Sequence, residues 1–175
     1  MKIGILGTGM IVKALMKTVD KLHFSRAVLL GTKETEEETK SMCREYGLDG
    51  YYLDYEELLE SDVDTIYVAL PNHLHYGFAK KALLAGKHVI LEKPGTSNAA
   101  QMRELEKLAA QEKKMLLEAM NIHYLPVFQS LKEHLKDLGT IKIVSLNYSQ
   151  YSSRYDAFRR GRCWRPLTRS GRAAR

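Results

Sequence analysis

Residues 1–9 read Met1-Lys2-Ile3-Gly4-Ile5-Leu6-Gly7-Thr8-Gly9, a short apolar run that leads directly into two closely spaced glycines. The run predicts a buried strand, and glycine at position 7 lets the backbone turn sharply out of it. Glycine at position 9 lets a pyrophosphate approach the backbone, beside the free N–H groups and the positive dipole end of a following helix. Apolar residues at helical spacing predict that helix over 10–22, at Ile11, Leu15, Val19 and Leu22. The stretch is typical of the start of a dinucleotide-binding unit.

The glycine pattern departs from the full fingerprint at one position. The fingerprint has a third small residue that lets the helix pack closely on the strand, and here Val12 stands in its place. A Gly-x-Gly pattern after a strand also occurs as a simple tight turn. The glycine pattern alone therefore does not distinguish a phosphate-binding site from a tight turn without a ligand, and other segments of the chain are needed to do so.

Strands and helices alternate over the next hundred residues. Expected strands lie at 2–7, 26–31, 64–70, 89–91 and 115–120; expected helices lie at 10–22, 34–46, 74–85 and 98–112, with a short helix capped by Asp54. This order predicts an α/β fold, a parallel sheet with helices on both faces and right-handed crossovers. In such sheets ligands bind beyond the carboxyl ends of the strands, where the strand order reverses.

A helix over 125–137 and a strand over 141–148 are expected next. The strand alternates in part, as a strand with one solvated face does. Together they are interpreted as the first helix and the first strand of a second α+β domain. An unpartnered edge strand exposes its pairing groups, so residues 141–151 are a predicted surface for association into a homo-oligomer.

The composition indicates a soluble globular protein of 175 residues, with 45% apolar and 27% charged residues. Apolar runs fall well short of the roughly 20 residues that a membrane span needs, and the N-terminal run is too short for a signal peptide. The two cysteines, Cys43 and Cys163, are far apart in the sequence. Such sparse cysteine usage, with no export signal, predicts a reduced, cytoplasmic protein without disulfides. The short apolar runs predict that the protein has no membrane association.

The basic charge is confined to the C-terminal end of the chain. The formal net charge is +6, yet residues 159–175 contain seven arginines and no acid, so residues 1–158 sum to −1. This tail has neither helical nor strand periodicity, and it is interpreted as an irregular, disordered segment produced by a reading-frame change. An arginine-rich tail could instead bind nucleic acid or another polyanion. The charge pattern disfavours that alternative, because Trp164 is the tail's one stacking residue and the body is slightly acidic.

Two polar segments follow the strands expected at 64–70 and 89–91, at the same sheet edge as the glycine turn. They are Pro71-Asn72-His73-Leu74-His75 and Glu92-Lys93-Pro94. The proline stiffens the second segment, because it fixes its own φ and restricts the residue before it. A lysine beside a nicotinamide ring could exchange a proton with a substrate hydroxyl while hydride moves. The alternative is that Glu-Lys-Pro forms a solvated turn without a chemical role.

A metal site is not expected from these segments. His73 and His75 are two residues apart, with no acid or cysteine spaced as a third ligand. They are interpreted as residues of a loop or of the start of a helix. The acidic run Glu34–Glu38 is likewise interpreted as the solvated start of a helix, where the dipole favours negative charge.

Four segments together carry a resemblance. They are Gly7-Thr8-Gly9, Leu70-Pro71-Asn72-His73-Leu74-His75, Ala85-Gly86-Lys87-His88-Val89 and Glu92-Lys93-Pro94. Their order and spacing over residues 1–158 resemble the successive signatures of the Gfo/Idh/MocA oxidoreductases. The resemblance implies a Rossmann-type domain and NAD(P)-dependent hydride transfer on a sugar, polyol or diol.

The resemblance also implies roles for individual residues. The phosphate turn would consist of Gly7, Thr8, Gly9, Met10 and Ile11. Further cofactor contacts would come from Pro71, Asn72, His75, Glu92 and Lys93, with Lys93 near the nicotinamide in the catalytic role. Asn121 matches the cofactor-contacting segment after the fifth main strand, although Ile122 and His123 stand where the family has arginines.

The cofactor's ribose site favours NADP over NAD. An acid that closes the second strand would bind a ribose 2′-hydroxyl. Here the strand ends Leu30-Gly31-Thr32-Lys33, and the first acid is Glu34. Thr32 and Lys33 could hold a 2′-phosphate instead.

The resemblance implies a second domain that completes the active site, and its signature is absent from this sequence. The expected organisation is a dinucleotide-binding domain over 1–122, the start of a substrate and dimerisation domain over 123–158, and the basic tail over 159–175. Two functions remain open alongside the enzyme. The chain could bind the dinucleotide without turning over a substrate, or the tail could bind a polyanion.

Overall fold

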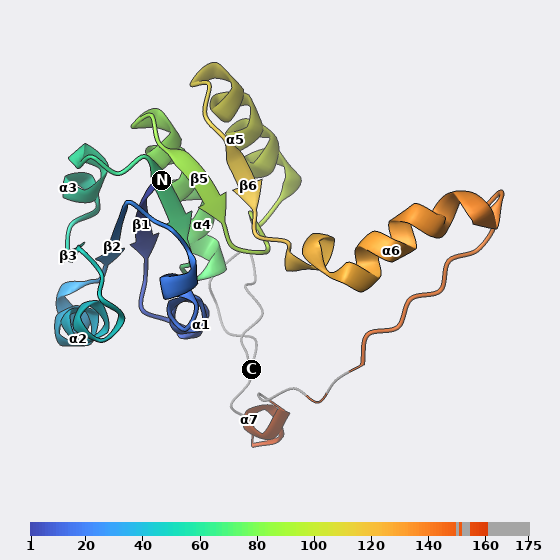
Figure 1. The fold of residues 1–175 in the computed structure, drawn as a ribbon, viewed down its shortest axis with the longest axis horizontal. Helices are drawn as coiled ribbons and strands as arrows, with labels where there is room; N and C mark the ends of the chain where they lie inside the picture. Colours follow the sequence, from blue (N-terminus) through green and yellow to red (C-terminus); the bar gives the residue numbers. More distant parts are fainter. Residues whose placement is uncertain (150, 152–154, 161–175) are drawn as a thin grey trace. The chain divides into compact units, whose positions relative to one another are not determined.

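The computed structural model describes residues 1–149, 151 and 155–160. Its centre is a six-stranded sheet in which all neighbouring strands are parallel. The strands are β1 (Lys2–Leu6), β2 (Arg26–Leu30), β3 (Gly50–Tyr52), β4 (Thr65–Val68), β5 (His88–Leu91) and β6 (Leu116–Glu118). Their order across the sheet is β3-β2-β1-β4-β5-β6 (Figure 1). This order confirms the predicted parallel α/β fold of Rossmann type.

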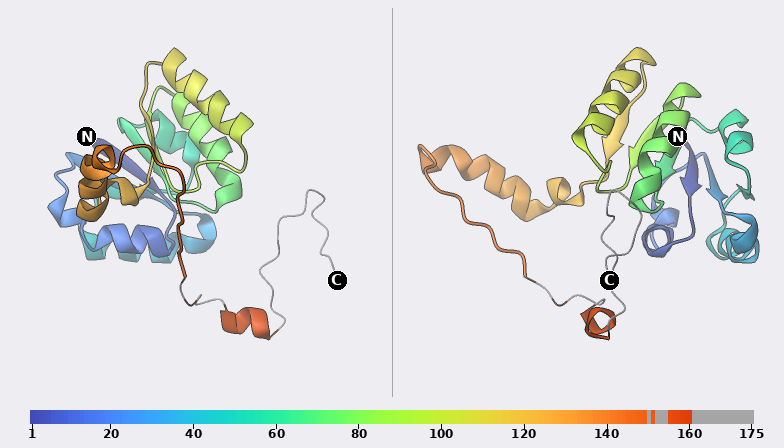
Figure 2. Two further views of the ribbon diagram at one scale, coloured as in Figure 1. Left: turned by 90° about the vertical axis from the view of Figure 1, so that its right-hand side faces the viewer. Right: turned by 180° about the vertical axis from the view of Figure 1, so that it is seen from behind.

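Helices cover both faces of the sheet (Figures 1 and 2). They are α1 (Met10–Met16), α2 (Glu36–Tyr46), α3 (Tyr55–Glu60), α4 (Asn72–Leu84) and α5 (Ala99–Gln111), with 3₁₀ turns at Val19–Lys21 and Lys33–Thr35. One core cluster contains α1 and α2 residues such as Val12 and Met42. The other contains α3, α4 and α5 residues such as Leu58, Leu83 and Leu105. Strands β1 to β5 alternate their side chains between these two clusters, which buries both faces of the sheet there, whereas Leu117 on the edge strand β6 is exposed.

The strand order reverses between β1 and β4. From β1 the chain moves outward to β2 and β3, and it then returns to β4 and moves outward the other way to β5 and β6. Gly7 N donates to Leu30 O at 2.9 Å and Glu92 N donates to Val68 O at 3.0 Å, so strand pairing extends to the carboxyl edge. The turns that follow β1, β2, β4 and β5 therefore lie along one edge, where ligands bind in sheets of this topology.

Two predicted features and one unexpected strand can be compared with the elements of the structure. The cap at Asp54 is confirmed, because its Oδ1 accepts hydrogen bonds from the backbone N–H groups of Glu56 at 2.8 Å and Glu57 at 3.1 Å. The helix predicted over 10–22 ends at Met16 and resumes as a 3₁₀ turn at Val19–Lys21. The short edge strand β3 was not expected, since three half-buried residues give no usable alternation.

Two compact units are present, Met1–Gln129 and a second unit that begins at Ser130. After β6 come a 3₁₀ turn at Asn121–Tyr124, α6 (Pro126–His134), a 3₁₀ turn at Leu135–Leu138 and α7 (Tyr155–Arg159). The strand expected at 141–148 is not formed, because residues 141–149 have no strand partner among the described residues. A strand needs a neighbour to bond its N–H and C=O groups, which the local sequence cannot supply. The tail prediction falls mainly on residues 161–175, outside the described residues.

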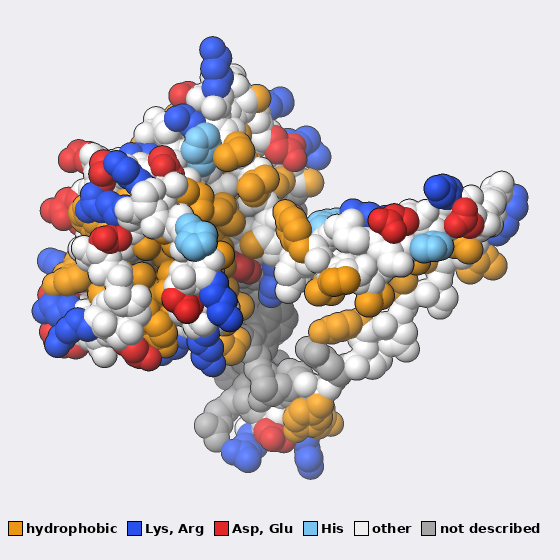
Figure 3. All heavy atoms as spheres, in the orientation of Figure 1, with side chains coloured by type: hydrophobic (Ala, Val, Ile, Leu, Met, Phe, Trp, Pro, Cys, Tyr) orange, Lys and Arg blue, Asp and Glu red, His pale blue; other side chains and the backbone are white. Residues whose placement is uncertain are grey.

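The structure also allows the predictions on membrane spans and surface charge to be compared with the described residues. No helix among them is long and apolar enough to cross a membrane. On the face of the first unit drawn in Figure 3, acidic and basic side chains are interspersed. Surface ion pairs such as Lys80–Glu104, at 2.7 Å, are part of this pattern.

Candidate functional site

The glycine turn between β1 and α1 has the geometry of an anion site. Gly7 has φ +99°, a conformation that L side chains rarely adopt, and a Cβ there would lie 3.2 Å from Ala69 O. Gly9 has φ −71° and caps α1, and a Cβ on it would have no atom within 4 Å. The backbone of Gly9 therefore faces open space at the N-terminus of a helix, where a phosphate group binds well. Met10 is exposed and Val12 is fully buried, so the valine packs inward without blocking the turn.

The end of β2 is shaped by a group of threonines. Gly31 is buried, and a Cβ on it would lie only 2.1 Å from Thr39 Oγ1, so α2 is pressed against the end of the strand. Thr32 and Thr35 form a reciprocal capping box that starts the 3₁₀ turn. Thr32 and Lys33 are exposed beside the glycine turn. The hydroxyl of Thr32 lowers the pKa of Glu34 by hydrogen bonding to its carboxylate.

The turn after β4 leads into α4. Pro71 is the N-cap of α4, and Pro71 and Asn72 are both exposed at the carboxyl edge. His75 lies one turn into the helix and is fully buried. Its Nε2 lies 2.7 Å from Leu70 O and its Nδ1 lies 3.0 Å from Pro94 O. The ring therefore links two turns of the edge from within the core, and a contact of His75 with a cofactor stays a prediction.

The turn after β5 carries the predicted catalytic lysine. The side chain of Lys93 is exposed, and its backbone N–H donates to Glu92 Oε2 at 3.2 Å. Tyr67 on β4 donates its hydroxyl to Glu92 Oε1 at 2.6 Å. Burial, and then the hydrogen bond to Glu92, raise the pKa of Tyr67, so the phenol stays protonated and holds the carboxylate. The Glu92 carboxylate is thus fixed between β4 and β5, directly before Lys93.

The next residues of the edge lie on and after β6. Glu118 Oε1 accepts a hydrogen bond from Gly95 N at 2.7 Å, which fixes the end of the Glu-Lys-Pro segment. Asn121 is exposed at the start of a 3₁₀ turn. Tyr67 and Glu118 were missed in the sequence reasoning. Tyr67 sits inside an apolar strand, and the sequence does not indicate its partner on the next strand.

Glu38 is a third residue that sequence reasoning missed. Its Oε2 accepts a hydrogen bond from Thr8 Oγ1 at 3.1 Å, and its Oε1 accepts one from Lys13 Nζ at 2.6 Å. The acidic run at the start of α2 was interpreted as a solvated face, and Glu38 is indeed exposed, but its two partners on the first βα unit were not expected. The sequence did contain a signal for this position of Glu38. Glu34 and Glu38 are four residues apart, about one helical turn, which places both acids near the end of β2.

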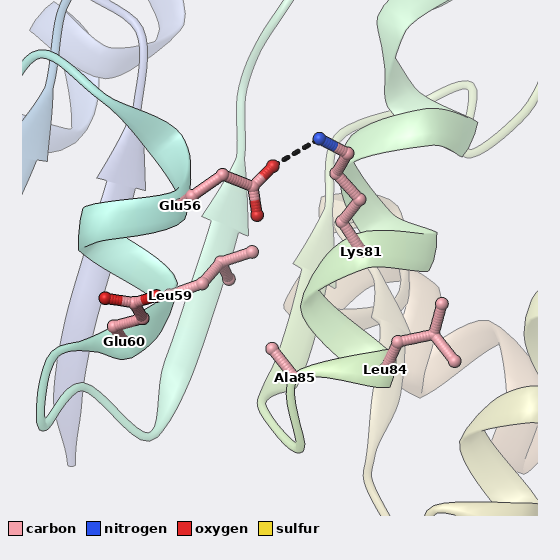
Figure 4. A pocket seen from close by; sticks show the side chains of 6 residues that line it. All are labelled: Glu56, Leu59, Glu60, Lys81, Leu84 and Ala85. Atoms are coloured by element: carbon pink, nitrogen blue, oxygen red, sulfur yellow. Dashed lines mark hydrogen bonds and ion pairs between the residues drawn. The ribbon is translucent and has the colours of Figure 1, made fainter.

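A hollow of about 330 Å³ lies between α3 and α4, away from this edge (Figure 4). Its lining consists of Glu56, Leu59, Glu60, Lys81, Leu84 and Ala85, and Lys81 pairs with Glu56 across it. The ends of both helices lead into the amino ends of β4 and β5. The hollow therefore belongs to the opposite edge of the sheet from the predicted site. Within the described ranges, no group of three or more His, Cys, Asp or Glu side chains could hold a metal ion.

Comparison with known proteins identifies the family. A family model described as an oxidoreductase family with an NAD-binding Rossmann fold, GFO_IDH_MocA, matches residues 1–120. The chain belongs to the Gfo/Idh/MocA oxidoreductase family. The matched residues contain β1 to β6 and, apart from Asn121, every predicted site residue of this Gfo/Idh/MocA chain. They form an NAD(P)-binding Rossmann domain.

Curated relatives of this Gfo/Idh/MocA chain include NADP-dependent dehydrogenases. The scyllo-inositol 2-dehydrogenase (NADP(+)) IolU of Bacillus subtilis is 43% identical over 111 residues, which cover 63% of this chain and 34% of the enzyme. The D-xylose 1-dehydrogenase (NADP(+)) 2 of Haloferax volcanii is 30% identical over 152 residues, which cover 85% of this chain and 46% of the enzyme. The matched segments thus span between a third and a half of these relatives.

Solved structures of the same family share the fold. KijD10, a 3-ketoreductase from Actinomadura kijaniata in complex with TDP-benzene and NADP, superimposes with a TM-score of 0.70 and 26% sequence identity. The match covers 78% of this Gfo/Idh/MocA chain and 43% of KijD10. A biliverdin reductase from Synechocystis in complex with biliverdin and NADP+ superimposes with a TM-score of 0.67 at 27% identity.

Proposed function

We propose that this chain binds NADP(H), in preference to NAD(H), along the carboxyl edge of its sheet. The observation that carries the proposal is the open glycine turn, where a Cβ on Gly9 would meet no atom within 4 Å. Gly7, Thr8, Gly9, Met10 and Ile11 would surround the pyrophosphate at the start of α1. Thr32 and Lys33 would hold the 2′-phosphate, since no acid closes β2. The NADP dependence in the names of two relatives supports this preference.

The other end of the dinucleotide would lie toward β4 and β5. Pro71 and Asn72 are exposed there and Glu92 is half-buried, so all three present surface to a ligand. Asn121 would add a contact after β6. His75 would act indirectly, because its ring holds the turns that carry Pro71 and Lys93.

We further propose that the reaction is hydride transfer on a sugar, polyol or diol, with Lys93 as the catalytic residue. When bound, the nicotinamide ring accepts or donates the hydride. The Lys93 ammonium would give a proton to the substrate oxygen in reduction, and the free amine would take it back in oxidation. Glu92, held by Tyr67 at 2.6 Å, would fix the backbone from which Lys93 extends. The inositol and xylose substrates in the names of relatives support this substrate class.

The test compares two glycine-to-alanine variants in calorimetric titrations with NADPH and NADH. Gly9→Ala places a methyl group where the pyrophosphate would lie, and its φ of −71° accommodates alanine, so the fold should survive. Gly77→Ala in α4 also adds a methyl group to open space, away from the turn. We expect NADPH to bind the wild type and Gly77→Ala alike, and to bind Gly9→Ala at least about tenfold more weakly. Equal binding by all three, or by none, would refute the proposal.

Turnover is a separate measurement. A panel of sugars and polyols with NADP+, read at the absorbance of NADPH, should give a rate that Lys93→Met abolishes, while NADPH still binds this variant through its remaining contacts. Binding without turnover on the whole panel would identify a dinucleotide-binding module instead of an enzyme. Salt-sensitive DNA or RNA binding lost on deletion of 159–175 would favour the polyanion alternative.

Two further proposals concern the cellular location and the self-association of the protein. A reducing, cytoplasmic location is supported by Cys43, which is a buried free thiol. Self-association through residues 141–151 is supported by the exposure of Ile143 and Leu146. Sedimentation of the full chain against a variant with Asp at both positions would test this association, which the variant should lose.

A further inference from the structure

A carboxylate from α2 reaches the glycine turn. Glu38 Oε2 accepts from Thr8 Oγ1 at 3.1 Å, and Glu38 Oε1 accepts from Lys13 Nζ at 2.6 Å. Thr8 lies between the two glycines of the turn, and Lys13 lies one turn into α1. Glu38 therefore joins α2 to the first βα unit at the edge where the dinucleotide is proposed to bind.

The position of Glu38 is fixed by packing on its own helix. The next residue, Thr39, is fully buried and donates its hydroxyl to Thr35 O at 2.8 Å. The Thr39 side chain lies so close to Gly31 that any Cβ there would overlap it. Gly7 N also donates to Leu30 O at 2.9 Å, which ties the glycine turn to the end of β2. Glu38 is thus held at the corner formed by the ends of β1 and β2.

In a Rossmann domain, the adenosine ribose of the dinucleotide binds at this corner, between the ends of β1 and β2. An acid there accepts hydrogen bonds from the 2′-hydroxyl of NAD, and a cation accommodates the 2′-phosphate of NADP. The end of β2 has Thr32 and Lys33 in place of the acid. Glu38 supplies a carboxylate to the same corner from a different element, and Lys13 offsets its charge. The hydrogen bond between them lowers the pKa of Glu38 and raises that of Lys13, so both stay charged at neutral pH.

We propose that the Lys13–Glu38 pair determines the preference between NADP(H) and NAD(H). This inference rests on the proposed binding of the dinucleotide. With Lys13 in place the Glu38 carboxylate is neutralised, and the 2′-phosphate meets the ammonium group of Lys33 next to Glu34, whose carboxylate is bonded by the Thr32 hydroxyl. Without Lys13 the free Glu38 carboxylate repels the 2′-phosphate and can accept from the 2′-hydroxyl. Glu38 is then a specificity-determining residue outside β2.

The experiment measures the ratio of the dissociation constants for NADH and NADPH in the full chain. Using the ratio cancels any general loss of binding that a small change in the fold would cause. Lys13→Met should lower the NADPH preference by about threefold to tenfold, the size expected for one screened charge several ångströms from a phosphate. Glu38→Gln should raise the preference by a similar factor, and the double variant should return close to the wild-type ratio.

Lys40→Met is the matched control. Lys40 pairs with Glu36 at 2.9 Å on the same helix, so its loss changes the net charge equally, and it should leave the ratio unchanged. If the wild type binds a dinucleotide but Lys13→Met and Glu38→Gln keep its ratio, the proposal is overturned and the proposed function stands. An equal shift in Lys40→Met would overturn it too, because net charge would then be the cause. If the wild type binds neither dinucleotide, the proposed function itself fails.

Discussion

The contact between Gly31 and Thr39 gives the sharpest test of how α2 is placed. In Gly31→Ala the new Cβ would lie 2.1 Å from Thr39 Oγ1 and 3.0 Å from Thr39 Cβ. Non-bonded carbon and oxygen atoms prefer about 3.5 Å, so α2 would have to move away by about 1 Å or more. Overpacking of this kind costs about 1–3 kcal/mol, and we expect about 2 kcal/mol of lost unfolding free energy.

A double-mutant cycle separates this overlap from other effects of the alanine. Thr39→Ala removes the overlapping hydroxyl and should by itself cost under about 1 kcal/mol, since it loses one hydrogen bond but gains helix propensity. In the double variant the nearest overlap is gone, so its destabilisation should be smaller than the sum of the single effects by about 1 kcal/mol or more.

The assay is urea unfolding followed by circular dichroism, with Gly77→Ala as the control. Gly77 lies in α4 with no atom within 4 Å of an added Cβ, so alanine there should stabilise the chain by about 0.5–1 kcal/mol. A Gly31→Ala variant as stable as the wild type would refute the packing argument. So would strictly additive effects in the cycle, because they would show that Thr39 is not what the new methyl group meets.

Three further outcomes are expected. Asp54→Ala removes the acceptor for two backbone N–H groups of α3 and should cost about 1 kcal/mol in urea unfolding, whereas Asp54→Asn should cost less. Leu58→Ala empties a fully buried site and should cost about 2–5 kcal/mol; a smaller loss would mean that the core closes around the gap. The pKa of Glu38 is lowered mainly by the Lys13 hydrogen bond, so its stabilisation is present above the unfolded pKa and is lost as pH falls through the folded pKa. Melting temperatures should therefore fall less steeply in Glu38→Gln than in the wild type below about pH 4.3, and equal slopes would contradict this.

The parts of the fold that depend on local pattern could be predicted from the sequence. Apolar runs located five of the six strands, and the Asp54 cap followed from side-chain chemistry alone. Alternation along residues 141–148 was misleading, because a strand forms only where a neighbour supplies hydrogen bonds. The short edge strand β3 was missed for the opposite reason, since its pairing with β2 forms it despite a weak pattern.

In the candidate site, too, some residues could be found from the sequence and others could not. The glycine turn and the Glu-Lys-Pro segment could be found because their residues are adjacent in the sequence. The roles of His75, Tyr67 and Glu38 could not, because each acts through a partner that only the folded chain brings near. Burial also separates the two histidines after β4: His73 is exposed and His75 is not.

The buried ring of His75 has a consequence for local opening. It connects Leu70 O, in the turn after β4, with Pro94 O, in the turn after β5. Neither turn can swing away from the sheet without breaking a contact to this ring, so the two should open together as one cooperative unit. The amides of Leu74, which donates to Pro71 O at 2.8 Å, and Gly95, which donates to Glu118, should then share one opening free energy in native-state hydrogen exchange. The two halves of the proposed nicotinamide end would form and melt as a single foldon.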